Sequence, residues 1–502
     1  MAYLMGIDVG TSSTKVLVIE ESGRVVAEAS HEYPISTPKE GWAEQDPELW
    51  WKAFRESIRK ISESVLREVV AIGLSGQMHG TVVLDRFGRP LRPAVIWADR
   101  RSLPQCREIY ARFGRESVLE LVCNPMMPGF MGPTLLWLLE NEPQTVRDAN
   151  VVLLPKDYVR LRLTGSVATD ASDASATLLF DVKARRWAEE LVSSLGIPLN
   201  LLPEVLESTD VAGEVTDEAS EETGLSAGIP VIVGGGDSQV GAVGCGAVKE
   251  GLISSNIGTG GQVFATINHV KVDPKHRVHT FCHAVPGRWC LQGAILSAGL
   301  SLRWFRDNLA HMEKVIGDLC SLDPYELLSM EAEAAEPGCR GLIFLPYLLG
   351  ERSPHMNPNA KGVLFGLTIE HRRAHIIRAI MEGVVYALKD SLEVFKELGV
   401  RAERVISRGG GAVSRLWRRI QADVFGVEVV RCKVGEEAAL GAALLAGVGV
   451  NVYRDVENAC SEAVKTVDTE SPNPENVKIY EHYYSKFYRR LYPTLEDYWR
   501  GR

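Results

Sequence analysis

Two short turns rich in glycine and hydroxyl side chains have the composition of phosphate-binding loops. The first is Gly10-Thr11-Ser12-Ser13, with one carboxylate, Asp8, at its mouth. The second is Gly258-Thr259-Gly260-Gly261, about 250 residues later. Neither turn fits G-x-x-x-x-G-K-[ST] or G-x-G-x-x-G. Because backbone N–H groups in such turns can hold an anion, the repeat predicts two turns that present amides to one phosphate chain.

Each turn is expected to join two apolar strands. The first pair runs through Ile7 and Val9 and then from Lys15 to Ile19, with a further turn at 21–24 before a third strand. The second pair flanks residues 258–261 in the same way. A strand, turn and strand that occur twice predict two similar domains that face each other.

A third glycine-rich loop is Gly409-Gly410-Gly411, which ends a predicted strand. A helix is predicted to begin near Ser414 and to stop at Gly426. Glycines at the end of a strand let the backbone approach a nucleotide closely.

The other expected elements frame these loops. A helix capped by Asp46 has an apolar stripe through Trp50, Phe54 and Ile58. Strand-like runs follow at 69–85 and 90–102, then a helical and loop-rich middle from about 103 to 228. A buried strand near 229–233 precedes three glycines and Asp237, which is therefore expected on a loop.

Composition limits the function. The chain has 502 residues, 45% hydrophobic and 24% charged, as expected for a globular enzyme of more than one domain. The net charge of −10 is spread along the chain, which argues against a nucleic-acid partner and leaves phosphate to backbone amides and metal. Nine scattered cysteines without C-x-x-C, and no signal peptide or transmembrane run, predict a cytoplasmic protein with reduced thiols and no membrane partner.

Five further segments complete a family resemblance. They are SGQMHG (75–80), LLPKDYVRLRLTG (153–165), GGGDSQVGAVG (234–244), FLPYLLGERSPHMNPNAKGVLFGLT (344–368) and EEAALGAALLAG (436–447). With the two hairpins, they resemble the FGGY carbohydrate kinases of the actin, sugar-kinase and heat-shock-chaperone superfamily over nearly the whole chain. The QMHG motif is similar to that of the family members that phosphorylate D-xylulose and differs from that of the members that phosphorylate glycerol.

The resemblance implies an α/β fold with two ribonuclease-H-like domains flanking a catalytic cleft. The N-terminal domain, 1–248, would carry the sugar site and the first phosphate hairpin. The C-terminal domain, 249–502, would bind ATP and end in a helix. The implied reaction moves the γ-phosphate of ATP to a terminal hydroxyl of a ketopentose, most closely D-xylulose, giving D-xylulose 5-phosphate. ATP, Mg²⁺ and a small sugar are the implied ligands, and a homodimer is one option for the assembly.

The resemblance implies a role for residues in several of these motifs. Asp237 would be the catalytic base, since phosphoryl transfer needs a base near the acceptor hydroxyl and otherwise alignment and charge neutralisation. Asp8 would hold Mg²⁺ through water. The expected sugar ligands are Gln77, Met78, His79, Asp99 and Ser238. The expected ATP ligands are Gly10, Thr11, Ser12, Gly258, Thr259, Gly260, Gly410, Gly411 and Ser414.

Two departures from the family pattern bear on the substrate. Asp99 lies in Trp97-Ala98-Asp99-Arg100, where the commoner sequence is Trp-Asn-Asp-Gly-Arg. Ser238 replaces the Asn that usually follows the base in the D-xylulose kinases and the Gln of glycerol kinases. Kinases of another pentulose or polyol, such as ribulose or a glycerol-like substrate, therefore remain the alternative.

Two other classes stay in view: a chaperone-type or cytoskeletal ATPase and a catalytically silent sugar-binding regulator. A chaperone would append a peptide-binding domain, and a filament protein has no reason to carry QMHG. A silent regulator should have lost Asp8 or Asp237, and both are present. A histidine and cysteine run, His276, His279, Cys282 and His283, has the look of a metal site, but a structural role is expected. The aromatic C-terminal segment, with helical spacing of Tyr480, Tyr484, Phe487 and Leu491, is expected to dock on the protein.

Overall fold

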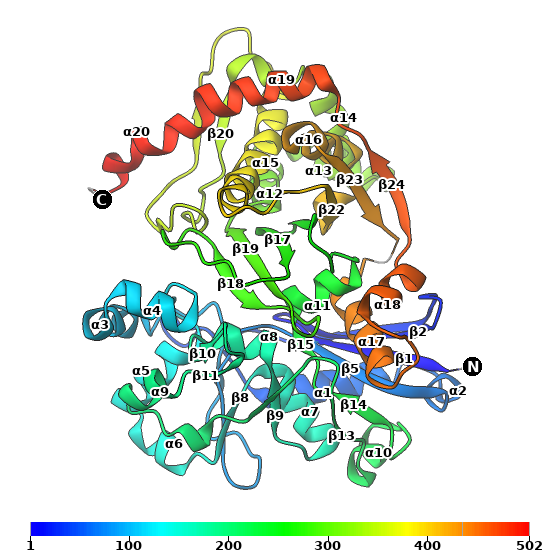
Figure 1. Ribbon diagram of the computed structural model, residues 1–502. Coiled ribbons are helices and arrows are strands. Elements are labelled where there is room, and N and C mark those ends of the chain that lie inside the picture. Colours follow the sequence, from blue (N-terminus) through cyan, green and yellow to red (C-terminus); the bar gives the residue numbers. More distant parts are fainter. Residues whose placement is uncertain (1, 434, 501–502) are drawn as a thin grey trace.

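Both glycine-rich turns close antiparallel hairpins, as predicted. The computed structural model describes residues 2–433 and 435–500, arranged as two α/β domains, one above the other in Figure 1. β1 (Tyr3–Val9) pairs antiparallel with β2 (Ser13–Glu20), which places Asp8 opposite Lys15. β16 (Leu252–Ile257) pairs antiparallel with β17 (Gly261–Ile267) in the same way.

The two large sheets have the same arrangement of their central strands. The first has the order β13 (Val211–Glu214), β14 (Pro230–Ile232), β5 (Val69–Gly76), β1, β2 and β3 (Val25–Glu32), with β15 (Gly235–Gly236) also paired to β5. The second has the order β18 (His279–Cys282), β19 (Trp289–Ile295), β17, β16, β22 (Arg404–Arg408), β23 (Glu428–Cys432) and β24 (Thr466–Glu470). In each sheet the first strand of the hairpin pairs parallel with a later strand, β5 or β22. The predicted duplication and α/β class are confirmed.

The remaining strands are short and form two-stranded sheets outside the two large ones. They are β4 (Glu44–Gln45), β6 (Val82–Leu84), β7 (Ala94–Val95), β8 (Val151–Leu153), β9 (Ala168–Asp170), β10 (Phe180–Asp181), β11 (Arg186–Trp187), β12 (Glu204–Leu206), β20 (Ile343–Leu345) and β21 (Val363–Phe365). The predicted run at 90–102 therefore contains only β7, and the middle that was expected to be helical also contains strands.

The helices of the first half are α1 (Pro47–Ile58), α2 (Glu63–Leu66), α3 (Leu103–Phe113), α4 (Arg115–Val122), α5 (Met131–Asn141), α6 (Pro143–Asp148), α7 (Pro155–Thr164), α8 (Ala171–Ala174), α9 (Glu189–Ser194), α10 (Asp217–Thr223) and α11 (Asp237–Gly244). Those of the second half are α12 (Gly299–Leu309), α13 (His311–Cys320), α14 (Pro324–Glu333), α15 (Arg373–Glu397), α16 (Arg415–Phe425), α17 (Glu437–Gly449), α18 (Val456–Ala463), α19 (Pro474–Tyr483) and α20 (Arg489–Arg500).

α1 forms for the reasons read from its sequence. The Asp46 side chain accepts from the amide of Glu48, and Pro47 occupies the first turn, where its missing N–H is no loss. The predicted stripe of Trp50, Phe54 and Ile58 is fully buried.

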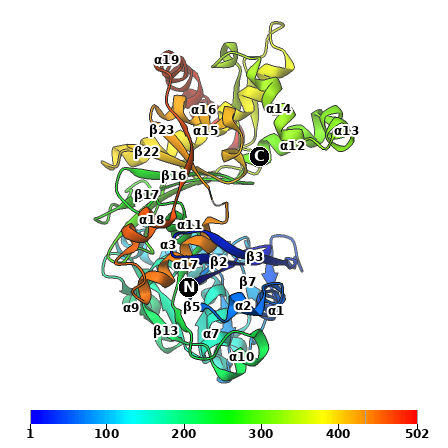
Figure 2. The same ribbon diagram turned by 90° about the vertical axis from the view of Figure 1, so that its right-hand side faces the viewer.

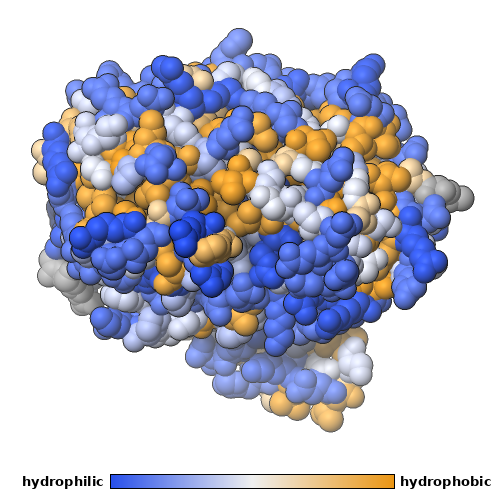
Figure 3. All heavy atoms as spheres, turned by 90° about the horizontal axis from the view of Figure 1, so that it is seen from below, coloured by the Kyte–Doolittle hydropathy of each residue, from blue (hydrophilic) through white to orange (hydrophobic). Residues whose placement is uncertain are grey.

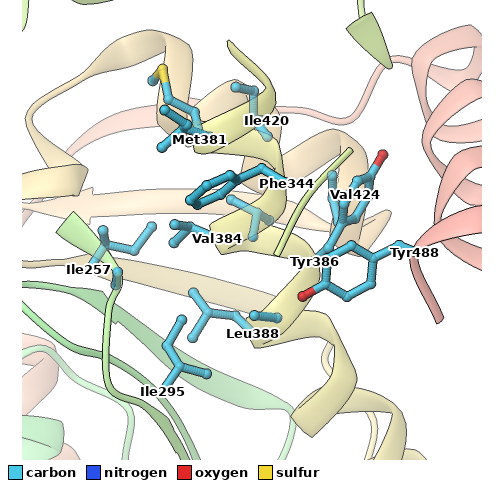
Figure 4. Close-up of a cluster of buried hydrophobic side chains, with 14 of the residues drawn as sticks. Ile257, Ile295, Phe344, Met381, Val384, Tyr386, Leu388, Ile420, Val424 and Tyr488 are labelled. Atoms are coloured by element: carbon cyan, nitrogen blue, oxygen red, sulfur yellow. The ribbon is translucent and has the colours of Figure 1, made fainter. Parts of the chain in front are cut away.

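α15 is the central helix of the second domain. Met381, Val384 and Leu388 point from it into a cluster that also contains Ile257, Ile295, Phe344 and Ile420 (Figure 4). This face accounts for the burial of a long apolar stripe in the centre of the second domain.

α17 crosses back to the first domain. It follows β23 in the chain yet packs on β1, β5 and α11, and Figure 2 shows it beside them. The contact is between backbones: a Cβ on Gly6 would lie 1.8 Å from the Ala439 oxygen, and one on Gly441 would lie 1.9 Å from the Val240 oxygen. The boundary proposed at 248/249 thus separates the two sheets but leaves α17 and α18 against the first of them.

The C-terminal segment docks on the second domain with one change of register. A π-helical turn at Tyr484–Tyr488 joins α19 to α20. Tyr480, Tyr484 and Tyr488 are buried, while Phe487 is 39% exposed, so the prediction for Phe487 was wrong. The wide turn keeps residues four apart on one face, which favours position 488 over 487.

The surface of the first domain seen in Figure 3 intersperses hydrophobic with hydrophilic residues. Across the described ranges, none of the helices has the length and apolar character to span a membrane.

Candidate active site

Asp8 lies in β1 just before the first turn. Its Oδ1 accepts a hydrogen bond from Ser75 Oγ at 3.0 Å, and its other oxygen has no hydrogen bond to any described residue. Burial raises the pKa of Asp8, while the Ser75 hydrogen bond and the charges of Lys15 and Arg408 oppose the shift. One carboxylate oxygen is thus left for a ligand.

Hydrogen bonds to the carbonyl oxygens of the first turn fix its conformation. The Gly10 amide donates to the Ser13 oxygen at 3.0 Å, and Gln45 Nε2 donates to the Thr11 oxygen at 2.8 Å. Thr11 Oγ1 accepts from Trp97 Nε1 at 2.9 Å, and Ser12 is exposed.

The second turn is held by the start of α12. The amides of Ala298 and Gly299 donate to the oxygens of Thr259 and Gly258, at 3.0 and 2.8 Å. A Cβ on Gly299 would lie 2.5 Å from the Gly258 oxygen, so this approach requires glycine.

Asp237 is the first residue of α11, not a loop residue as expected. The N-cap is Gly236, so Asp237 does not cap the helix. Burial first, and then the charge of Asp8, raises the pKa of Asp237 to about 7, against the hydrogen bonds of Ser238 and the charge of Arg408. A carboxyl with that pKa can accept a proton near neutral pH.

Ser238 links the base to the other domain. Its Oγ donates to Asp237 Oδ1 at 3.3 Å and accepts from Gln262 Nε2 at 3.2 Å. Gln262 lies in β17, directly after the second turn, and was not predicted as a site residue. Only its position beside that turn could have marked it.

Met78 lies against the residue that precedes α11, and His79 follows Met78 in the chain. A Cβ on Gly236 would lie 2.8 Å from Met78 Cγ. His79 has a φ of 73° and its Nδ1 bonds the Ala176 oxygen at 2.8 Å, so Nδ1 carries the proton and Nε2 is an acceptor. Burial lowers the pKa of His79 to about 3, which keeps the ring neutral. The ring stacks on Phe130 with centroids 3.6 Å apart.

Gln77 supports the first turn rather than facing a sugar. Its Nε2 donates to Gln45 Oε1 at 2.8 Å and to the Gly10 oxygen at 3.3 Å, and its buried Oε1 has no hydrogen-bond partner.

Asp99 is fully engaged, contrary to its expected role as a free sugar ligand. Its two oxygens accept from Arg101 Nε and Nη2, from the Arg101 amide at 2.8 Å and from the Ala43 amide at 2.7 Å. A carboxylate has about four acceptor sites. A sugar hydroxyl could bind Asp99 only by displacing one of these donors.

The third glycine loop is open at its centre. A Cβ on Gly410 would meet nothing within 4 Å, whereas one on Gly411 would lie 2.6 Å from Ile257. Ser414 instead caps α16: its Oγ accepts from the Trp417 amide at 3.3 Å and bonds Ser329 Oγ at 3.1 Å. The predicted ATP contact of Ser414 would compete with this cap.

Arg408, at the end of β22, was not predicted. Its Nη2 lies 2.3 Å from where a Cβ on Gly241 would be, so the guanidinium rests on α11 one turn after Asp237. Its Nε is 4.0 Å from Glu437 Oε1 and makes no hydrogen bond. The residue directly precedes the three glycines, which was the one available signal.

The histidine and cysteine run has other partners. His279 Nδ1 bonds Asn124 Oδ1 at 3.2 Å and His283 Nε2 bonds Thr266 Oγ1 at 3.1 Å.

A pocket of about 320 Å³ between α15 and α20 is lined by none of the predicted site residues.

Comparisons with known proteins cover nearly the whole chain. The N-terminal domain model of the FGGY family of carbohydrate kinases matches residues 3–244, and the C-terminal domain model matches 253–450. The xylulose kinase of Escherichia coli (strain K12) is 38% identical over 98% of this chain and 99% of its own. That of Bacillus subtilis (strain 168) is 35% identical over 99% and 98%. A crystal structure of a xyloylose kinase from Brucella ovis has a TM-score of 0.90 at 34% identity and covers 99% of each chain.

Proposed function

Because the chain belongs to the FGGY family of carbohydrate kinases, we propose that it transfers the γ-phosphate of ATP to O5 of D-xylulose. The products are D-xylulose 5-phosphate and ADP. The substrate class is supported by the xylulose kinases at 38% and 35% identity over nearly full length. The single structural observation that carries the proposal is Asp237 at the start of α11, with Met78 against the preceding Gly236 and with Ser238 hydrogen-bonded to Gln262 of the second domain.

Asp237 accepts the proton of the sugar hydroxyl as that oxygen attacks the γ-phosphorus. Its pKa of about 7 suits this task, because a base near the working pH is both available and strong enough. Ser238 and Gln262 orient the carboxylate. The His79 Nε2 accepts from a sugar hydroxyl, and Met78 provides an apolar wall.

The two turns hold the phosphates of ATP through their amides, and the open glycine at 410 leaves room for the nucleotide. Asp8 fits a magnesium site, because it keeps one oxygen free and Mg²⁺ usually takes one or two carboxylates together with phosphates and water. When bound, the ion neutralises phosphate charge. Closing of the domains excludes water from the acceptor position.

An ATP-coupled assay tests the substrate across D-xylulose, D-ribulose, L-ribulose, xylitol and glycerol, with the product identified by mass spectrometry. We expect D-xylulose to have the highest kcat/KM. Preference for ribulose or a polyol would move the substrate within the family, whereas ATP hydrolysis that no sugar stimulates would indicate a non-kinase ATPase.

Asp237→Asn tests the base. It keeps shape and hydrogen bonding but cannot take a proton, so we expect kcat to fall by roughly 10² to 10⁴ while sugar binding is kept. Turnover within a few-fold of the wild type would remove Asp237 from this role.

A homodimer and a cytoplasmic location are part of the proposal, and light scattering tests whether the protein is a dimer.

A further inference from the structure

An arginine without an acidic partner lies near His79. Arg352 follows β20, and within the described residues it forms no ion pair; its Nε is buried without a hydrogen bond. Burial lowers its pKa to about 10 and raises that of the neighbouring Glu351 to about 8, so Glu351 does not supply a full counter-charge near pH 7. Arg352 is half-buried, and a cation without an acidic partner and with a buried, unpaired Nε has donors free for an oxygen-bearing ligand.

A short relay fixes the guanidinium. Asn124 Nδ2 donates to the carbonyls of Val122 and Thr280, at 2.9 and 2.6 Å, which makes Oδ1 the acceptor. That oxygen takes the Thr280 amide at 3.0 Å and His279 Nδ1 at 3.2 Å. His279 therefore carries its proton on Nδ1, and its Nε2 accepts from Arg352 Nη2 at 3.4 Å.

Phe130 connects this group to the sugar side. Its ring stacks on His79 at 3.6 Å, and the Arg352 Cζ lies 5.9 Å from its centroid, with the His279 ring 6.2 Å away. After burial, the charge of Arg352 is a further cause that lowers the pKa of His79. Arg352 thus brings a cation from the second domain to the wall that His79 and Phe130 form.

The position of Arg352 determines which end of the substrate it could contact. In the proposed reaction O5 lies at Asp237, so the C1 and C2 end of an extended ketopentose lies away from the base, towards His79 and Phe130. We propose that Arg352, positioned by His279, donates a charge-assisted hydrogen bond to the C2 carbonyl oxygen and so favours ketoses over polyols. This inference rests on the proposed function.

Arg352→Met tests it, because the methionine keeps an apolar stem against Phe130 and removes every donor. We expect the KM for D-xylulose to rise about 10- to 100-fold, with the KM for ATP within twofold. The ratio of kcat/KM between D-xylulose and xylitol should fall towards one. His279→Leu should act in the same direction, and the double variant should match Arg352→Met alone, because His279 acts through the arginine.

Arg340→Met, an exposed arginine of the same domain, is the matched control, and thermal unfolding with ATP-analogue binding identifies variants that fail to fold. A folded Arg352→Met with a KM for D-xylulose within threefold of the wild type overturns the inference. If Arg352→Met does not fold, a folded His279→Leu with a KM for D-xylulose within threefold of the wild type overturns it instead. If the wild type uses another ketose, the proposed substrate fails and the same ratio is measured on that ketose and its polyol. A wild type that prefers polyols overturns both.

Discussion

Burial and two charged neighbours, Asp8 and Arg408, set the acid–base behaviour of Asp237. Burial and the charge of Asp8 raise its pKa, and Arg408 acts in the opposite direction. Because the two carboxyl groups interact, a measured pKa belongs to the pair rather than to one residue.

Activity should therefore be lost on the acid side of neutrality. As the pH falls through about 7, Asp237 becomes protonated and kcat/KM for the sugar should drop about tenfold per pH unit. Arg408→Met removes a cation that lowers this pKa, so its acid limb should move to higher pH. The pH profile of kcat/KM checks both statements, with Arg404→Met, an exposed residue of the same strand, as the control. Superimposable limbs for wild type and Arg408→Met would contradict the role of Arg408.

Substitutions of Ser238 test its contacts with Asp237 and Gln262. An asparagine there can also donate to Asp237 and accept from Gln262, so Ser238→Asn should change kcat/KM for D-xylulose by less than about tenfold. Ser238→Ala loses both bonds and should lower kcat more than the asparagine does. Steady-state kinetics of the three proteins decide it. Activity on D-xylulose that appears only in Ser238→Asn would show that the wild-type substrate differs.

Among the elements, α11 and α17 are joined by a close backbone contact. The helices touch through glycines, and α11 carries Asp237 at its first residue while α17 rests on the strand that carries Asp8. Their packing therefore sets the distance between the two carboxylates.

Gly441→Ala should destabilise the protein. Its Cβ would lie 1.9 Å from the Val240 oxygen, so the helices must separate, at a cost of about 1 to 3 kcal/mol. Gly435→Ala is the matched control, since a Cβ there meets nothing within 4 Å. Thermal unfolding measures both. Equal melting temperatures for the two variants would mean that this contact adjusts freely.

For the whole molecule, the chain passes between the domains three times. The crossings lie between α11 and β16, between β23 and α17, and between α18 and β24. Segments without regular structure that lie between two rigid bodies can absorb a change of angle, as hinges do.

Binding of both substrates should close the molecule. The two turns belong to different domains and would meet on one phosphate chain, so small-angle scattering should show a smaller radius of gyration with D-xylulose and a nonhydrolysable ATP analogue. Each ligand alone serves as the control. An unchanged radius with both would indicate that the unliganded protein is already closed.

The local sequence pattern was sufficient to predict those elements whose residues alone specify a turn, a strand or a helix cap. The hairpins around 10–13 and 258–261, the cap of α1 and the helix from Ser414 to Gly426 follow from period, turn chemistry and capping within a few residues. Motif resemblance was sufficient for the family, and it marked Asp237 and His79 as candidates.

Tertiary structure decided what depends on partners distant in the chain. Asp99 proved to be saturated by Arg101 and Ala43, and α17 proved to lie on the first sheet. Arg408 and Arg352 reach the site only because strands and loops of the second domain end there. Sequence spacing carries no information on such contacts, because side-chain hydrogen bonds and burial are set by how distant segments pack.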